Sequence, residues 1–143
     1  MKKVVISSEK APKASLYFSQ ATLTINTYRL ELSGQIGIDA QTEQLVSGGI
    51  AGQTQQCFTN IGYILSELGW TCDEIVKVRV YLTSMKHYQE VNEIYKTKFK
   101  FSPPARVTVA VKELPMGALV EIECTAESDE LSEDAQYKYS LRR

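Results

Sequence analysis

Apolar residues recur every three or four positions in two stretches of the chain, which is the spacing of a helix that buries one face. In the first stretch the apolar positions are Cys57, Ile61, Ile64, Leu65 and Leu68. Gly69 follows as a stop signal, so a helix is predicted over about residues 52–68. In the second stretch they are Tyr88, Val91, Ile94, Tyr95 and Phe99. A helix is predicted over about residues 85–98, with Thr83 or Ser84 as its N-cap.

Short runs rich in β-branched and aromatic residues surround these two helices and predict strands. The runs are residues 4–6, 21–25, 28–33, 75–82, 105–111 and 119–126. Asn26 and Thr27 suggest a hairpin between the second run and the third. The order of strands, helix, strand, helix and strands predicts one α+β domain, in which both helices pack on one face of a mixed sheet. The chain of 143 residues suffices for one such domain.

Polar residues alternate with apolar ones in the last two runs. The apolar rows are Ala105, Val107, Val109 and Val111 in one run and Val120, Ile122, Cys124 and Ala126 in the other. Because strand side chains alternate between faces, Arg106 and Thr108 are expected on the opposite face, together with Glu121 and Glu123. A guanidinium and a carboxylate would then share one surface, where the planar fork of the arginine suits a small carboxylate.

The same face would also receive Arg79 and Tyr81 from residues 75–82. This mixture is too polar for a core and too regular for a solvated surface, so a subunit interface is expected there. After residue 126 the composition turns acidic and ends in Arg142 and Arg143. Residues 127–143 are therefore expected to form a mobile charged tail that follows a domain of residues 1–126.

Charge and cysteine usage restrict the classes of partner. The net charge of −1, without a dense Lys/Arg cluster, lacks the electrostatic footprint of a nucleic-acid binder. Cys57, Cys72 and Cys124 are widely spaced and His87 is the sole histidine, which argues against a disulfide framework or a metal site. No run approaches the roughly 20 apolar residues of a membrane-spanning helix, so no membrane partner and a cytoplasmic location are expected.

Short motifs are spread along the chain in a defined order and spacing. They are Ala11-Pro12, Ser33-Gly34-Gln35-Ile36, Gly48-Gly49-Ile50, Gln53-Thr54, Val91-Asn92-Glu93-Ile94-Tyr95, Pro104-Ala105-Arg106 and Leu114-Pro115-x-Gly117-Ala118-Leu119-Val120-Glu121-Ile122-Glu123. With these motifs the chain resembles the RidA/YjgF family of enamine/imine deaminases, over roughly residues 6–126.

The resemblance implies a chorismate-mutase-like α+β fold that assembles into a homotrimer, with sites in the clefts between subunits. It implies hydrolysis of reactive 2-imino acids, such as 2-iminobutanoate, to 2-keto acids and ammonia, with no metal or organic cofactor. Arg106 matches the arginine that clamps the substrate carboxylate, and Glu121 matches the carboxylate that holds the attacking water. Ser33 and Gly34 match the family's pocket loop, and Asn92 matches its helix asparagine.

Two positions depart from the family pattern. Many members have a tyrosine where this chain has Phe18, so an aromatic ring remains while its hydroxyl is lost. Several members have a cysteine where this chain has Thr108, which keeps a hydroxyl of similar size and lacks thiol reactivity. Both residues are predicted to contact the substrate.

These departures leave a second reading open, in which the same cleft binds small carboxylates for regulation and does not catalyse. A third reading is the ribonuclease activity attributed to some relatives. The near-neutral charge and the single histidine of the chain argue against it.

Overall fold

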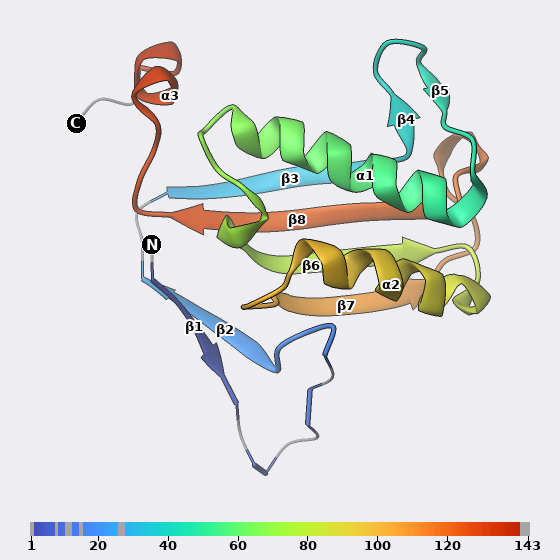
Figure 1. Cartoon of the computed structure of the whole chain (residues 1–143), viewed down its shortest axis with the longest axis horizontal. Coiled ribbons are helices and arrows are strands. Elements are labelled where there is room, and N and C mark those ends of the chain that lie inside the picture. The colour runs from blue at the N-terminus through green and yellow to red at the C-terminus, as the bar shows by residue number, and fades with distance from the viewer. Residues whose placement is uncertain (1, 8, 11–12, 15, 26–27, 141–143) are drawn as a thin grey trace.

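The computed structural model describes residues 2–7, 9–10, 13–14, 16–25 and 28–140. Its centre is a four-stranded sheet in the order β3 (Tyr28–Ile36), β8 (Val120–Ser128), β6 (Ile75–Leu82) and β7 (Ala105–Ala110). The β6–β7 pair is parallel and the other two pairs are antiparallel, so the sheet is mixed. Helices α1 (Gly49–Ser66) and α2 (Tyr88–Lys98) cover one face of it (Figure 1). The predicted α+β arrangement is confirmed.

The hydrophobic core fills the space between this face of the sheet and the two helices. Alternate residues of β6 and β8 are fully buried there, which confirms the half-buried pattern expected from the sequence. The helices contribute their apolar stripes, and the rings of Phe58 and Tyr95 meet edge to face with centroids 5.9 Å apart. Cys57 and Cys124 lie in this core as packing residues.

The helices begin at positions slightly different from the predicted ones. Helix α1 starts at Gly49, about one turn early, because Gly48 with a φ of 98° turns the chain directly into the helix. Ser84 accepts a hydrogen bond from the backbone of Lys86, as predicted for a cap. It caps a 3₁₀ turn, however, and α2 begins only at Tyr88. The 3₁₀ turns of the chain are η1 (Cys72–Glu74), η2 (Met85–His87) and η3 (Pro115–Gly117).

Two short hairpins lie outside the central sheet. Strands β1 (Lys2–Ile6) and β2 (Ala21–Ile25) pair with each other and slant away from the sheet (Figure 1). Strands β4 (Ile38–Asp39) and β5 (Gln44–Leu45) form the second hairpin, which the sequence patterns missed because each strand has two residues. Asn26 and Thr27 lie outside the described residues. The hairpin predicted at that point is wrong, since β2 pairs with β1 whereas β3 pairs with β8.

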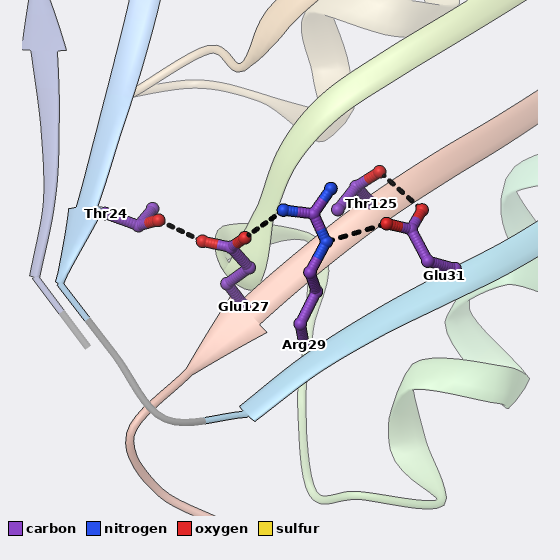
Figure 2. A network of polar contacts seen from close by, with 5 residues as sticks. All are labelled: Thr24, Arg29, Glu31, Thr125 and Glu127. Carbon is purple, nitrogen blue, oxygen red and sulfur yellow. Dashed lines mark hydrogen bonds and ion pairs between the residues drawn. The ribbon is translucent and has the colours of Figure 1, made fainter.

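A polar network ties the first hairpin to the sheet on the face that no helix covers (Figure 2). The nearly buried side chain of Glu127 accepts hydrogen bonds from Arg29 Nη1, at 2.9 Å, and from the hydroxyl of Thr24. Arg29 Nε donates to Glu31 at 2.7 Å, and Thr125 donates to the other oxygen of Glu31 at 2.8 Å. The network joins β2, β3 and β8, so this end of the open face is polar and internally satisfied.

The C-terminal segment is docked on the domain, which corrects the expectation of a mobile tail that begins at residue 127. Strand β8 continues through Ser128, and helix α3 (Glu133–Lys138) follows it. The indole nitrogen of Trp70 donates to the carbonyl of Glu130 at 2.8 Å, and the backbone of Ser132 donates to Leu68 at 3.1 Å. Ala135 is 1% exposed. The acidic composition of the segment gave no sign of these backbone contacts.

Replacing Ala135 by aspartate is expected to release α3 from the domain, because a carboxylate would have to be buried without a partner. The melting temperature should fall by roughly 3–8 °C. The matched control is Tyr137→Asp, which places the same charge on the same helix at a side chain that is 75% exposed. Calorimetry that finds equal melting temperatures for the two variants would show that α3 adds nothing to stability.

Candidate functional site

Arg106 extends from β7 toward α2 and is held there by two neutral acceptors. Its Nη1 donates to Asn92 Oδ1 at 2.7 Å, and its Nη2 donates to the Tyr88 hydroxyl at 3.2 Å. Tyr88 and Asn92 are four residues apart on α2 and therefore point to the same side of the helix. Asn92 is fully buried, so it supports the guanidinium from behind.

Aromatic rings surround the same guanidinium. The Arg106 Cζ atom lies 4.6 Å from the ring centroid of Tyr95, 5.6 Å from that of Tyr88, 5.8 Å from that of Phe18 and 5.9 Å from that of Tyr17. Such rings attract a cation and exclude water from part of its surface. No carboxylate of the described residues forms an ion pair with Arg106. The cation is thus oriented and partly desolvated without a counter-ion.

A cavity of about 310 Å³ opens beside Arg106. Phe18, Met85, Tyr88, Arg106, Val107 and Thr108 line it. The structure therefore brings together three of the predicted site residues, Arg106, Phe18 and Thr108. The hydroxyl oxygen of Thr108 is buried and makes no hydrogen bond within the part of the chain that the structure describes. It gives the wall of the cavity a polar atom with unused bonding capacity.

Glu121 lies in a second cavity, of about 300 Å³, on the face of the sheet that carries no helix. Gly34, Tyr81, Val111, Glu113, Leu114, Glu121 and Glu123 line it. A Cβ atom on Gly34 would lie 2.1 Å from Glu121 Oε1, so the glycine lets the carboxylate lie against the backbone of β3. Ser33 is exposed next to Gly34. Tyr81 donates to Glu123, and this hydrogen bond raises the pKa of the tyrosine.

Within one chain, Arg106 and Glu121 lie on opposite faces of the sheet, and the prediction that they share a surface is wrong. On the central strand β6, Val78 is paired with Arg106, whereas Tyr81 is paired with Glu121. Residues 78 and 81 of a strand point to opposite faces. The alternation of side chains shows which residues of a strand share a face, but it does not show which of the two faces lies toward the helices. In β7 the apolar row is the outer one, and its Val107 and Val109 are each 40% exposed.

Tyr88 and Met85 were not predicted as site residues. Tyr88 counted as part of the apolar stripe of α2, although Tyr88, Asn92 and Tyr95 follow the i, i+4, i+7 spacing of one helix side. This spacing places Tyr88 and Asn92 on the same side of the helix as the ring of Tyr95, and it could have identified Tyr88 as a site residue. Glu113, which also was not predicted as a site residue, lines the Glu121 cavity.

Comparison with known proteins identifies the family. The family model described as Endoribonuclease L-PSP matches residues 8–128. The chain belongs to the RidA/YjgF family. The human protein named 2-iminobutanoate/2-iminopropanoate deaminase is 44% identical to it over 122 residues, which cover 85% of this chain and 88% of the human protein. A RutC family protein of Aquifex aeolicus is 47% identical over 123 residues, which cover 85% of this chain and 96% of the relative.

Solved structures of the RidA/YjgF family have the same fold. The crystal structure of a Rid family protein of unknown function from Yersinia pestis has a TM-score of 0.80 at 28% identity, covering 90% of this chain and 100% of that one. RidA from an Antarctic Psychrobacter species has a TM-score of 0.67 at 34% identity, covering 87% of this chain and 99% of that one. The family model ends at Ser128, so α3 lies beyond the matched region.

The cysteine thiols of this RidA/YjgF protein are poor candidates for reactive groups. Burial raises the pKa of the Cys57 thiol to about 12 and also raises the pKa values of Cys72 and Cys124, which disfavours reactive thiolates.

Among the described residues, no three or more His, Cys, Asp or Glu side chains are grouped so that they could bind a metal ion. No helix in the described part of the chain is long and apolar enough to span a membrane.

Replacing Gly34 by alanine is expected to displace the carboxylate of Glu121, because the new methyl group would occupy its position. The flexible carboxylate can turn away, so the protein should stay folded while its kcat for an imine falls at least about tenfold. Gly62→Ala is the matched control, since a Cβ atom there meets no atom within 4 Å. That change in α1 should leave kcat unaltered and stabilise the protein by about 0.5–1 kcal/mol. Equal kcat values for the two variants in steady-state assays would contradict the role of Gly34.

Proposed function

We propose that this protein hydrolyses 2-imino acids and their enamine tautomers, such as 2-iminobutanoate, to 2-keto acids and ammonia. The observation that carries the proposal is the oriented Arg106 guanidinium, which has no counter-ion among the described residues and opens onto a cavity. A carboxylate bound there would supply the missing charge through two parallel hydrogen bonds. The names of the mammalian relatives, 42–44% identical, support the imine as the group that reacts.

In the proposed reaction, Arg106 binds the substrate carboxylate and Glu121 holds a water molecule beside C2. The water oxygen forms a bond to C2 as one of its protons passes to Glu121, and the electron pair of the C=N bond moves to nitrogen. The carboxyl group of Glu121 then gives this proton to nitrogen, which completes a neutral carbinolamine. Its carboxylate next takes the hydroxyl proton of the carbinolamine and passes it to the same nitrogen, so that ammonia leaves as the C2–N bond breaks and the keto group forms. Hydrolysis of an imine is intrinsically easy, so positioning and one general base suffice without a cofactor.

Two chains are required for this reaction, because one chain holds Arg106 and Glu121 on opposite faces of its sheet. The proposal therefore includes a homotrimer of the chorismate-mutase-like type, in which the Arg106 cavity of one subunit faces the Glu121 cavity of the next. Exposed apolar side chains support a contact there: Val107 beside Arg106 is 40% exposed, and Met85 is 46% exposed. In this arrangement Asn92 positions Arg106, while Phe18, Thr108, Ser33 and Gly34 surround the substrate.

The test is acceleration of 2-oxobutanoate release when the protein is added to a threonine dehydratase that produces 2-iminobutanoate. A rate above that of spontaneous hydrolysis, proportional to the protein added, is expected. Saturable binding of 2-oxobutanoate without any acceleration would overturn the proposal and support a carboxylate-binding regulatory protein instead. The three free cysteines support a reducing cytoplasmic compartment for this activity.

A further inference from the structure

Two aromatic rings line the Arg106 cavity. One of them lacks a hydroxyl, and the other carries a hydroxyl that is hydrogen-bonded to the guanidinium. Phe18 and Tyr88 both line the cavity, and their ring centroids lie at similar distances from the guanidinium, 5.8 and 5.6 Å. The family resemblance gives tyrosine as a common residue at the position of Phe18. The hydroxyl of Tyr88 is therefore a polar group in the cavity that the family resemblance does not assign.

The hydroxyl of Tyr88 already accepts one hydrogen bond, and its own proton is available for donation. It accepts a hydrogen bond from Arg106 Nη2 at 3.2 Å through an oxygen lone pair. A tyrosine hydroxyl can also donate its proton, and no acceptor for that proton exists among the described residues. A carboxylate held by the two terminal nitrogens of Arg106 would place an oxygen next to Nη2, on the side of this hydroxyl.

We infer that Tyr88 is a substrate-binding residue whose hydroxyl donates a hydrogen bond to the carboxylate that Arg106 holds, in place of the hydroxyl that Phe18 lacks. The inference rests on the proposed function, since it names a further contact to the same substrate. It also explains how a site with phenylalanine at position 18 keeps three donors on the carboxylate, two from Arg106 and one from Tyr88.

Tyr17, the neighbour of Phe18, is not the replacement. Its ring lies 5.9 Å from the guanidinium, but Tyr17 is not among the residues that line the cavity. Tyr95 is excluded as well, because it is fully buried and its hydroxyl makes no contact with the cavity. Tyr88 alone among these three tyrosines lines the cavity and hydrogen-bonds Arg106.

The test compares Tyr88→Phe, the double variant Phe18→Tyr/Tyr88→Phe and wild type. One lost hydrogen bond to a charged group should raise KM for 2-iminobutanoate, and Kd for 2-oxobutanoate by calorimetry, about 10–150-fold in Tyr88→Phe. The kcat should stay within about twofold, because the contact is equal in ground and transition states. The double variant, with the hydroxyl moved to position 18, should recover most of the loss. Tyr139→Phe, which removes a hydroxyl that donates to Glu67 from the residue after α3, should match wild type.

The outcomes separate this inference from the proposed function. Wild-type KM and Kd values in Tyr88→Phe would overturn the role of the hydroxyl, and a lower kcat at unchanged KM would do so too. If the double variant fails to recover affinity, a hydroxyl at position 18 does not replace the hydroxyl of Tyr88, and this part of the inference is overturned. If the wild-type protein binds 2-oxobutanoate but shows no turnover, the proposed function fails, and the Kd values of the variants still decide the role of Tyr88.

Discussion

Replacing Arg106 by methionine is expected to lower kcat/KM for 2-iminobutanoate at least about a hundredfold. Methionine fills a similar volume among the surrounding rings, but it removes two charge-assisted hydrogen bonds to the substrate, each worth about 1.5–3 kcal/mol. Since about 1.4 kcal/mol corresponds to a factor of ten, the loss of both bonds reaches that size. Steady-state kinetics with 2-iminobutanoate, together with titration by 2-oxobutanoate, measures the effect on catalysis and on binding.

The control is Lys100→Met, which removes a positive charge from an exposed residue outside both cavities. It should keep the wild-type kcat/KM and the wild-type affinity for 2-oxobutanoate. Circular dichroism of Arg106→Met should match that of wild type, because the replaced charge has no ionic partner among the described residues. A folded Arg106→Met protein with wild-type kcat/KM would remove Arg106 from the reaction.

Subunits that carry Arg106→Met and subunits that carry Glu121→Gln are expected to regain activity when they are assembled together. Each variant alone should be inactive, since loss of the general base costs about 10²–10⁴-fold. In a cyclic trimer with sites between subunits, random assembly of equal amounts pairs an intact Arg106 with an intact Glu121 in about one quarter of the sites. The mixture should therefore show about a quarter of the wild-type kcat per site after refolding from a common denatured state.

The control for the mixture replaces the Glu121→Gln partner by the double variant Arg106→Met/Glu121→Gln. No site in that mixture contains an intact Arg106, so its activity should stay at the level of the single variants. An equally inactive mixture of the two single variants would place both residues of a site in one chain. That outcome would contradict the arrangement of the two cavities on opposite faces of the sheet.

Most of the helices and strands were predicted correctly, because the residues that specify each of them lie within that element. The predicted strands over residues 21–25 and 75–82 coincide with β2 and β6, and Ser84 caps a turn as expected. Both helices were placed within a turn, since an apolar stripe of period 3.6 followed by a stop signal defines a helix without reference to the rest of the chain. The α+β class followed from their order.

The face toward which Arg106 points could not be predicted from alternation. In an edge strand such as β7, both faces carry a mixture of residues, and the side toward α2 is chosen by partners far away in sequence. Asn92 and Tyr88 offer acceptors there, which no pattern within residues 105–111 reveals. The docking of α3 was missed for the same reason, because Trp70 and Leu68 supply its contacts from another part of the chain.

The placement of Arg106 and Glu121 on opposite faces of one sheet has a kinetic consequence. On the proposed assembly, an isolated subunit holds two halves of different sites and no complete one. Activity per molecule would then rise with protein concentration and vanish on dilution below the dissociation constant of the trimer. The amount of this protein in a cell would act as a threshold, below which imines are left to spontaneous hydrolysis.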